Sequence, residues 1–227
     1  MALLVPAEPL TIDRAWSEAV QDLQAPAWKQ LALLCNDLGR GLWRALSLVA
    51  VGLLLLVARR WVALLAFAAA ESIAPLLSAL LKAAVDRPRP PGGLVQPVGS
   101  SFPSGHATYG GATAVALVVL FTLPGPRRRL WWALAVLGIA VMAWSRTYLQ
   151  VHWLSDVVAG SLLGAGVAAV VFGLAQVWVT QPDRSRARPE PAARTGRRPA
   201  RSRRESGSPP GRTPPPDAAP ETGAPRP

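Results

Sequence analysis

The chain has 227 residues, of which 51% are hydrophobic, and its 24 basic and 13 acidic side chains give a formal net charge of +11. The apolar residues are gathered into long blocks instead of alternating with polar ones, which excludes an ordinary soluble domain and is typical of a membrane protein. A single cysteine, Cys35, excludes an internal disulfide framework.

The first region, residues 1–37, contains no run that is long enough to cross a bilayer. Met1 to Leu10 is short and lacks the basic start of a secretory signal. Thr11 to Asp37 mixes charged and apolar residues at helical spacing. This pattern predicts one or two amphipathic helices that lie on the bilayer or against the bundle.

Five apolar runs follow, and a helix needs about 20 apolar residues to cross a bilayer. The runs are residues 38–58, 61–81, 107–123, 130–148 and 157–179. The first of them qualifies if Arg40 and Arg44 extend their charged ends to the interface. We therefore predict an all-α, polytopic membrane bundle over residues 38–180, with five spans and possibly a degenerate sixth at the N-terminus.

The basic charge is concentrated at the C-terminal end. Residues 181–227 contain 11 arginines, five acidic residues and 12 of the 23 prolines. With almost no large apolar side chain, this tail cannot bury enough surface to offset its ordering entropy, so we predict that it is disordered. Its charge favours contact with anionic lipid headgroups over nucleic acid, because the chain lacks a basic face with interleaved aromatic residues.

The arginine clusters also predict the orientation in the membrane. Clusters follow alternate spans: Arg59 and Arg60, Arg127 to Arg129, and Arg184, Arg186 and Arg188. The positive-inside rule puts these clusters and the tail in the cytoplasm. The loops 83–106 and 147–155 then lie on the non-cytoplasmic face, and they hold both histidines of the chain together with two arginines that topology alone would discourage.

Three short motifs lie in or beside these two loops. They are "KAAVDRPRP" at residues 82–90, "PSGH" at 103–106 and "SRTYLQVHWLSD" at 145–156. Together they resemble the signature of the type 2 phosphatidic acid phosphatase (PAP2) family, which shares its site with the vanadium haloperoxidases. The resemblance covers about residues 60–175 and implies the membrane lipid phosphatase branch. Membrane members usually have six spans, and the first is missing or vestigial in this chain.

The chemistry of phosphate transfer agrees with this resemblance. The transition state spreads negative charge over three phosphoryl oxygens, which fixed cations stabilise. Lys82, Arg89 and Arg146 supply three cations, and guanidinium groups bind phosphate oxygens two at a time. Ser104 and Gly105 precede a predicted helix whose positive end can cradle a phosphate. We therefore expect these five residues to bind phosphate, without a metal or another cofactor.

The remaining motif residues predict a nucleophile and an acid. His152 and Asp156 are four residues apart and share a face if the last helix begins near His152. Asp156 would then orient the ring of His152, which attacks phosphorus and becomes a phosphohistidine. His106 remains to protonate the leaving group.

These residues predict an integral membrane phosphatase whose site lies on the non-cytoplasmic face of the cell membrane. The substrate would be a lipid phosphomonoester or pyrophosphate: phosphatidate, phosphatidylglycerophosphate, a lysophospholipid or a polyprenyl (pyro)phosphate. A phosphotransferase that uses the same phosphohistidine is the main alternative. A vanadate-dependent haloperoxidase is a weaker one, because those enzymes are usually soluble.

Two further charged residues lie outside the predicted catalytic set. Arg87 is expected only to reach toward lipid headgroups, since Arg89 takes the motif position. Glu71 lies midway along a predicted span, on the same helical face as Lys82 and roughly 16 Å below it. We expect Glu71 to make a structural polar contact inside the bundle, and a role in headgroup or proton handling is the alternative.

Overall fold

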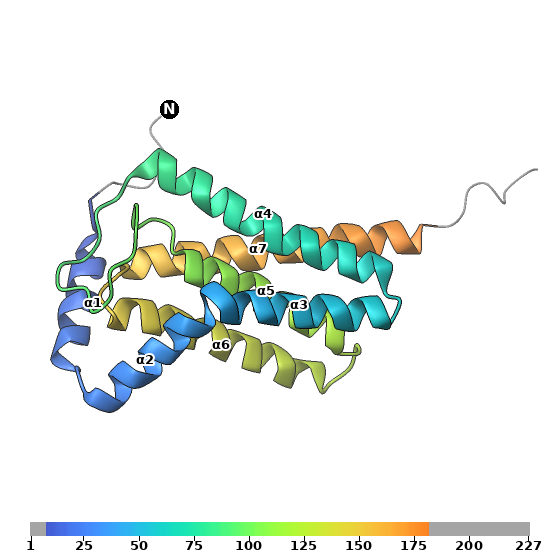
Figure 1. The fold of residues 1–227 in the computed structure, drawn as a ribbon, viewed down its shortest axis with the longest axis horizontal. Coiled ribbons are helices and arrows are strands. Elements are labelled where there is room, and N and C mark those ends of the chain that lie inside the picture. The colour runs from blue at the N-terminus through green and yellow to red at the C-terminus, as the bar shows by residue number, and fades with distance from the viewer. Residues whose placement is uncertain (1–7, 182–227) are drawn as a thin grey trace, which may run out of the picture. The chain divides into compact units, whose positions relative to one another are not determined.

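The computed structural model describes residues 8–181, which form seven α-helices and no strand (Figure 1). In chain order they are α1 (Thr11–Asp22), α2 (Pro26–Leu38), α3 (Gly41–Val57), α4 (Trp61–Val85), α5 (Gly105–Phe121), α6 (Arg128–Tyr148) and α7 (Leu154–Thr180). The predicted all-α fold is confirmed. The tail predicted to be disordered lies, apart from Gln181, outside the described residues.

Each of the five predicted apolar runs forms a helix, α3 to α7. Within residues 8–181, α4, α6 and α7 are each long and apolar enough to cross a membrane, and α2 and α3 together make a fourth candidate that is bent by 56°. Helix α5 is apolar but has only 17 residues. The large apolar side chains exposed on these helices are the groups that a lipid environment accepts. The number of spans stays a prediction.

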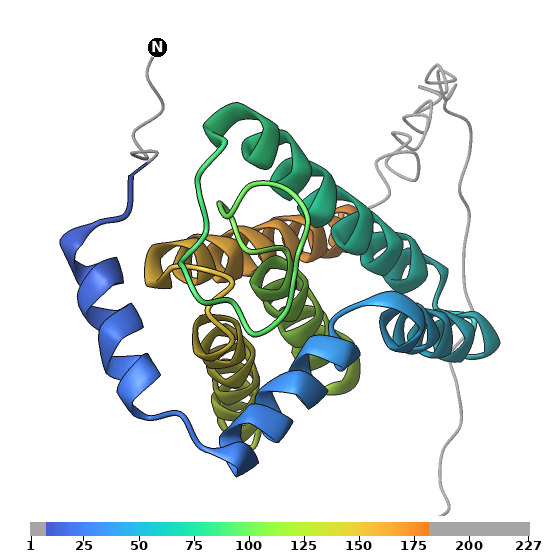
Figure 2. The ribbon, with the colours of Figure 1, turned by 60° about the vertical axis from the view of Figure 1, so that its left-hand side comes forward.

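Helix α5 lies between α4, α6 and α7, and packs on all three (Figure 2). Its approach to α7 is close because the facing positions are glycines. A Cβ atom at Gly160 would lie 2.5 Å from the Ser104 carbonyl oxygen, and one at Gly164 would overlap the carbonyl of Thr108. Small residues of this kind let helix backbones meet in membranes. The first turns of α5 and α7, which carry two of the motifs, are thereby brought together.

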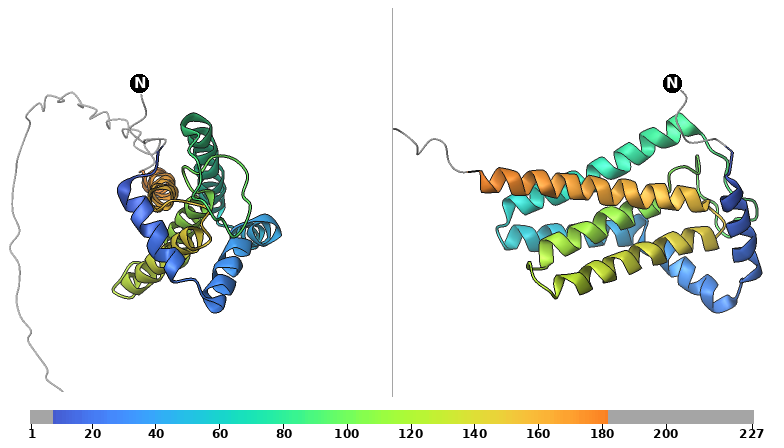
Figure 3. Two further views of the ribbon diagram at one scale, coloured as in Figure 1. Left: turned by 90° about the vertical axis from the view of Figure 1, so that its left-hand side faces the viewer. Right: turned by 180° about the vertical axis from the view of Figure 1, so that it is seen from behind.

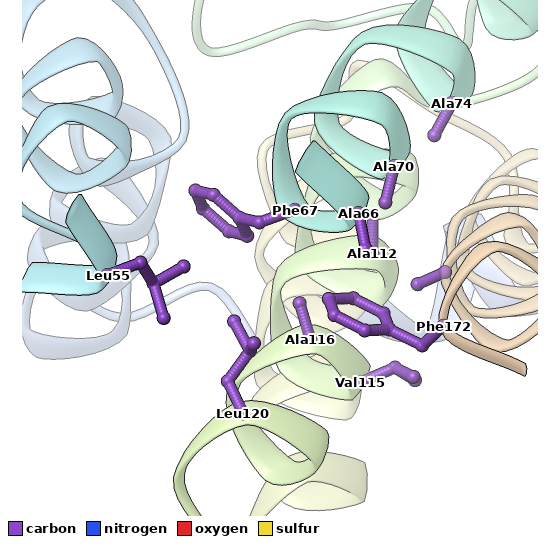
Figure 4. Close-up of a cluster of buried hydrophobic side chains, with 11 residues drawn as sticks. Leu55, Ala66, Phe67, Ala70, Ala74, Ala112, Val115, Ala116, Leu120 and Phe172 are labelled. Carbon is purple, nitrogen blue, oxygen red and sulfur yellow. The ribbon is translucent and has the colours of Figure 1, made fainter. Parts of the chain in front are cut away.

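The apolar core fills the half of the bundle away from the motifs. Figure 4 shows alanines of α4 and α5 lying between two large rings, Phe67 of α4 and Phe172 of α7, with Leu55 of α3 at the edge. Glu71 is buried near this cluster, and its Oε1 accepts a hydrogen bond from Thr113 Oγ1 of α5 at 2.8 Å. The predicted polar contact inside the bundle is confirmed.

The two N-terminal helices fold across the end of the bundle where the motifs lie. Figure 3 shows α1 crossing the ends of α6 and α7, and α1 contacts both of them. The turn between α1 and α2 is fixed by Tyr148, whose hydroxyl accepts from the Ala25 amide at 2.8 Å and donates to the Ala25 carbonyl at 3.0 Å. Residues 11–38 therefore pack against the bundle and close over its motif end.

Candidate active site

The three motifs meet around one cavity of about 320 Å³. Six of the eight predicted site residues line it: Lys82, Arg89, Gly105, His106, Arg146 and His152. They come from the last turn of α4, the α4–α5 loop, the start of α5, the end of α6 and the α6–α7 loop. The other two, Ser104 and Asp156, are fully buried beside it. Segments that are 70 residues apart in sequence are thus combined into one site.

The three motif cations are anchored by neutral oxygen atoms. Lys82 Nζ donates to the Ser100 carbonyl at 2.8 Å, and Arg89 Nη1 donates to the Val151 carbonyl at 2.6 Å. Arg146 Nη1 donates to Asn36 Oδ1 at 2.8 Å. In the described part of the chain none of the three forms an ion pair with a carboxylate. Their positive charge therefore stays available to an anion in the cavity.

The two ring nitrogens of His152 face different partners, Arg89 and Asp156. Its Nε2 is 3.4 Å from Arg89 Nη1, and because arginine only donates, Nε2 acts as an acceptor. Its Nδ1 lies 3.6 Å from Asp156 Oδ2, which assigns the ring proton to the Asp156 side. Burial lowers the pKa of His152 to about 4; the contact with Asp156 opposes this shift, and Arg146 and Arg89 add to it.

The pairing of His152 with Asp156 does not depend on a shared helical face. Helix α7 begins at Leu154, two residues after His152, so His152 lies in the loop that precedes the helix. The chain reaches the same geometry by a turn, because Asp156 Oδ2 accepts from the Trp153 amide at 2.9 Å and so closes the start of α7. The carboxylate also accepts from the Ser101 hydroxyl.

Arg87 is the largest departure from the sequence prediction. Instead of reaching toward lipid headgroups it is 2% exposed and lies between two buried carboxylates. Its Nη1 donates to Asp156 Oδ1 at 2.6 Å, and its Nη2 donates to Asp13 Oδ2 of α1 at 2.8 Å. Asp13 also accepts from the Ser155 amide at 2.8 Å. The headgroup interpretation of Arg87 is wrong, since burying this charge requires the two acidic partners that it has.

The start of α5 presents backbone groups to the cavity. Ser104 is the N-cap of α5, and its hydroxyl faces the Ala107 amide at 3.5 Å instead of lining the cavity. The first backbone hydrogen bond of the helix runs from the Thr108 amide to the Ser104 carbonyl. The Gly105 and His106 amides precede it and have no intrahelical acceptor, which is the arrangement that binds anions at helix N-termini.

The last turn of α2 and the turn that follows it contact His106. The Nε2 atom of His106 lies 3.1 Å from the carbonyl oxygen of Asn36 in α2, and a Cβ atom at Gly39 would overlap the imidazole ring. The backbone carbonyl of Asn36 thus contacts His106, and the side chain of Asn36 accepts from Arg146. Arg40, one residue beyond Gly39, also lines the cavity. Sequence reasoning missed Asn36 and Arg40 as cavity residues, because neither belongs to a motif.

Comparison with known proteins identifies relatives of this chain. Residues 60–179 match the family model of the PAP2 superfamily. An undecaprenyl-diphosphatase of Sulfolobus acidocaldarius is 38% identical over 73 residues, which are 32% of this chain and 32% of that protein. A decaprenylphosphoryl-5-phosphoribose phosphatase of Mycobacterium tuberculosis is 37% identical over 134 residues, 57% of this chain and 69% of that one. The chain therefore spans about a third of the length of the first relative.

Solved structures give the same result for the fold. The transmembrane PAP2 type phosphatidylglycerolphosphate phosphatase of Bacillus subtilis superposes with a TM-score of 0.63 at 26% identity, over 72% of this chain and 84% of that one. LpxE of Aquifex aeolicus superposes with a TM-score of 0.62 at 20% identity, over 74% and 99%. The family match covers more than half of the chain and contains all three motifs, so the chain belongs to the PAP2 superfamily.

Proposed function

We propose that this chain is an integral membrane lipid phosphatase that hydrolyses a lipid phosphomonoester or pyrophosphate through a phosphohistidine. One observation carries the proposal: three cations without a carboxylate partner in residues 8–181 surround the cavity that His152 Nε2 faces. A doubly charged phosphoryl group fits such a cavity, and a neutral imidazole beside it is a nucleophile.

The reaction starts with the terminal phosphoryl group held by Lys82, Arg89 and Arg146. His152 Nε2 attacks phosphorus in line with the bond to the leaving oxygen, so that the N–P bond forms while this P–O bond breaks. The imidazole becomes positively charged, and Asp156, 3.6 Å from Nδ1, stabilises that charge. Water then attacks the phosphohistidine, which releases inorganic phosphate and restores the neutral ring.

His106 is the group proposed to protonate the leaving oxygen. It lines the cavity from the start of α5. In the structure its Nε2 lies 3.1 Å from the Asn36 carbonyl, which only accepts, so Nε2 carries the ring proton and Nδ1 serves the leaving oxygen after it has bound a second proton. Catalytic hydrogen bonds often reach their working geometry only in the complex with substrate.

The membrane setting determines how the substrate arrives. The chain is a membrane protein, and we propose that it has five spans, with the cavity on the non-cytoplasmic face and the tail in the cytoplasm, on the strength of its arginine clusters. A headgroup can then enter the cavity while its hydrocarbon tail stays in the bilayer. Both curated relatives are named for polyprenyl-linked phosphates, which favours that class among the candidates.

The experiment is a phosphate-release assay in detergent over phosphatidate, phosphatidylglycerophosphate and polyprenyl mono- and diphosphates. Wild-type protein should release phosphate from at least one of them in EDTA, and His152→Ala should release none. Activity of a folded His152→Ala protein would refute the phosphohistidine. If the labelled phosphate appears on a lipid or sugar acceptor instead of as inorganic phosphate, the chain acts as a phosphotransferase.

A further inference from the structure

Arg40 is a fourth cation at the catalytic cavity, and it differs from the other three in how it is held. It lines the cavity from the turn between α2 and α3, outside the residues 60–179 that match the family. Its side chain is exposed. Lys82, Arg89 and Arg146 are anchored on protein oxygens, whereas the Arg40 side chain makes no hydrogen bond or ion pair with any residue among 8–181.

The turn that carries Arg40 borders the side of the cavity where the leaving group departs. In an in-line displacement the nucleophile and the leaving oxygen lie on opposite sides of phosphorus. His152 is the proposed nucleophile, and His106 is the group proposed to serve the leaving oxygen. The Asn36 carbonyl is 3.1 Å from His106 Nε2, and Gly39 is packed against the same ring. Arg40 therefore follows directly after the residue that contacts the leaving-group acid.

The charges in the cavity point to a substrate with more than one phosphate. The transferred phosphoryl group carries about two negative charges, which the three anchored cations balance without Arg40. A guanidinium has five N–H donors and binds phosphate oxygens in pairs. We propose that Arg40 binds a second phosphate, on the leaving-group side of the scissile bond. This proposal rests on the proposed function and narrows its substrate to lipids in which another phosphate neighbours the one that is removed.

For a lipid diphosphate the step balances as follows. His152 Nε2 bonds to the terminal phosphorus, and the bond from that phosphorus to the bridging oxygen breaks with its electron pair left on oxygen. The bridging oxygen becomes part of a lipid monophosphate, which leaves as an anion and, unlike an alkoxide, needs no proton from His106, and Arg40 stabilises the added charge. Water cleaves the N–P bond and yields inorganic phosphate. The leaving group gains charge during this step, so Arg40 acts most strongly in the transition state.

The test compares Arg40→Gln with wild-type protein in detergent on farnesyl diphosphate, farnesyl monophosphate and phosphatidylglycerophosphate. Loss of a hydrogen bond to a charged group costs about 1.5–3 kcal/mol, which corresponds to about a 10- to 150-fold loss of kcat/KM. We expect that loss on farnesyl diphosphate and less than about a threefold loss on farnesyl monophosphate. Arg40→Lys should recover part of the activity. Arg14→Gln, an exposed arginine of α1 outside the cavity lining, is the matched control and should behave as wild type on every substrate.

Phosphatidylglycerophosphate separates the two kinds of second phosphate. A loss of kcat/KM confined to farnesyl diphosphate would indicate that Arg40 binds the second phosphate of a directly bonded pyrophosphate. A loss on both farnesyl diphosphate and phosphatidylglycerophosphate would indicate that Arg40 also binds a second phosphate that lies several bonds away. Equal losses on all three substrates, or no loss on any, would overturn the proposal. Failure of the proposed function is distinguishable, because wild-type protein would then release no phosphate from any substrate, or His152→Ala would stay active.

Discussion

Arg87 Nη1 donates to Asp156 Oδ1 at 2.6 Å, so the carboxylate that contacts His152 is bound to an arginine that the sequence analysis left out of the site. The same guanidinium donates to Asp13 at 2.8 Å, and Arg87, Asp13 and Asp156 are all 2% exposed or less. A helix from the beginning of the chain thereby helps to hold the carboxylate that orients the proposed nucleophile.

Replacing Arg87 by Met should destabilise the protein severely. The change leaves two buried carboxylates without their counter-charge, a loss of about 3–5 kcal/mol of unfolding free energy. Thermal unfolding followed by tryptophan fluorescence in detergent measures it. Adding Asp13→Asn to Arg87→Met should restore part of the loss, because one unpaired charge is removed. The control Arg14→Met should leave the midpoint nearly unchanged, and an equally stable Arg87→Met protein would contradict the ion pair.

The activity should extend to unusually low pH. His152 attacks only as the neutral ring, and burial lowers its pKa to about 4, so the neutral form predominates above that pH. The acidic limb of kcat/KM, which reports the free enzyme, should therefore fall near pH 4 instead of near the ordinary histidine value of about 6.5. Arg146 contributes to the lowered pKa. Arg146→Gln should accordingly move the limb to higher pH as well as reduce the rate, and an unchanged limb would argue against this cause.

Replacing Gly39 by Ala should impair His106, the proposed proton donor, although Gly39 itself belongs to none of the three motifs. Gly39 has an ordinary φ of −85°, so alanine strains no backbone there, but its Cβ would overlap the His106 ring. We expect a large loss of kcat on an alkyl phosphate, whose leaving oxygen needs a proton, and a small loss on p-nitrophenyl phosphate, whose leaving group does not. Gly138→Ala, which meets nothing within 4 Å, is the control. Equal losses on both substrates would place the effect elsewhere.

The proposed orientation can be tested with single cysteines at Gly93 and Pro126 in a Cys35→Ser background. A membrane-impermeant thiol reagent added outside intact cells should label position 93, beside the cavity loop, and leave position 126 unlabelled until the membrane is opened. The reverse pattern would put the cavity on the cytoplasmic face. It would also remove the outer leaflet as the source of substrate.

The motif residues were predictable because each motif is local and chemically specific. Lys82, Arg89 and His152 were assigned because the three motifs together resemble the PAP2 signature and because their side chains suit phosphate transfer, and the structure brings them to one cavity. The apolar runs likewise gave the five helices α3 to α7, since length and hydropathy determine such helices. Even Glu71 followed from helical geometry, because its predicted face turns toward Thr113 of α5.

The rest of the site depends on contacts that no local pattern contains. The amphipathic spacing of residues 11–37 predicted helices, but not that they would fold across the motif end. Asp13 reaches Arg87 over a separation of 74 residues, and Asn36 reaches Arg146 over 110. Arg87 was misjudged for the same reason. Its partners become visible only when α1 has been placed, and without them an arginine beside a membrane is expected to face the headgroups.

The contact of Asp13 with the Ser155 amide, 2.8 Å long, closes the N-terminus of the last helix with a side chain from the first. A fragment trimmed to residues 60–179 would carry every motif residue and yet lack this acid, the Asn36 carbonyl and Arg40. The segment that the family model matches is consequently smaller than what must fold together in this chain. Transplanting residues 60–179 into another membrane scaffold should yield a bundle that has the catalytic groups but holds them in the wrong positions.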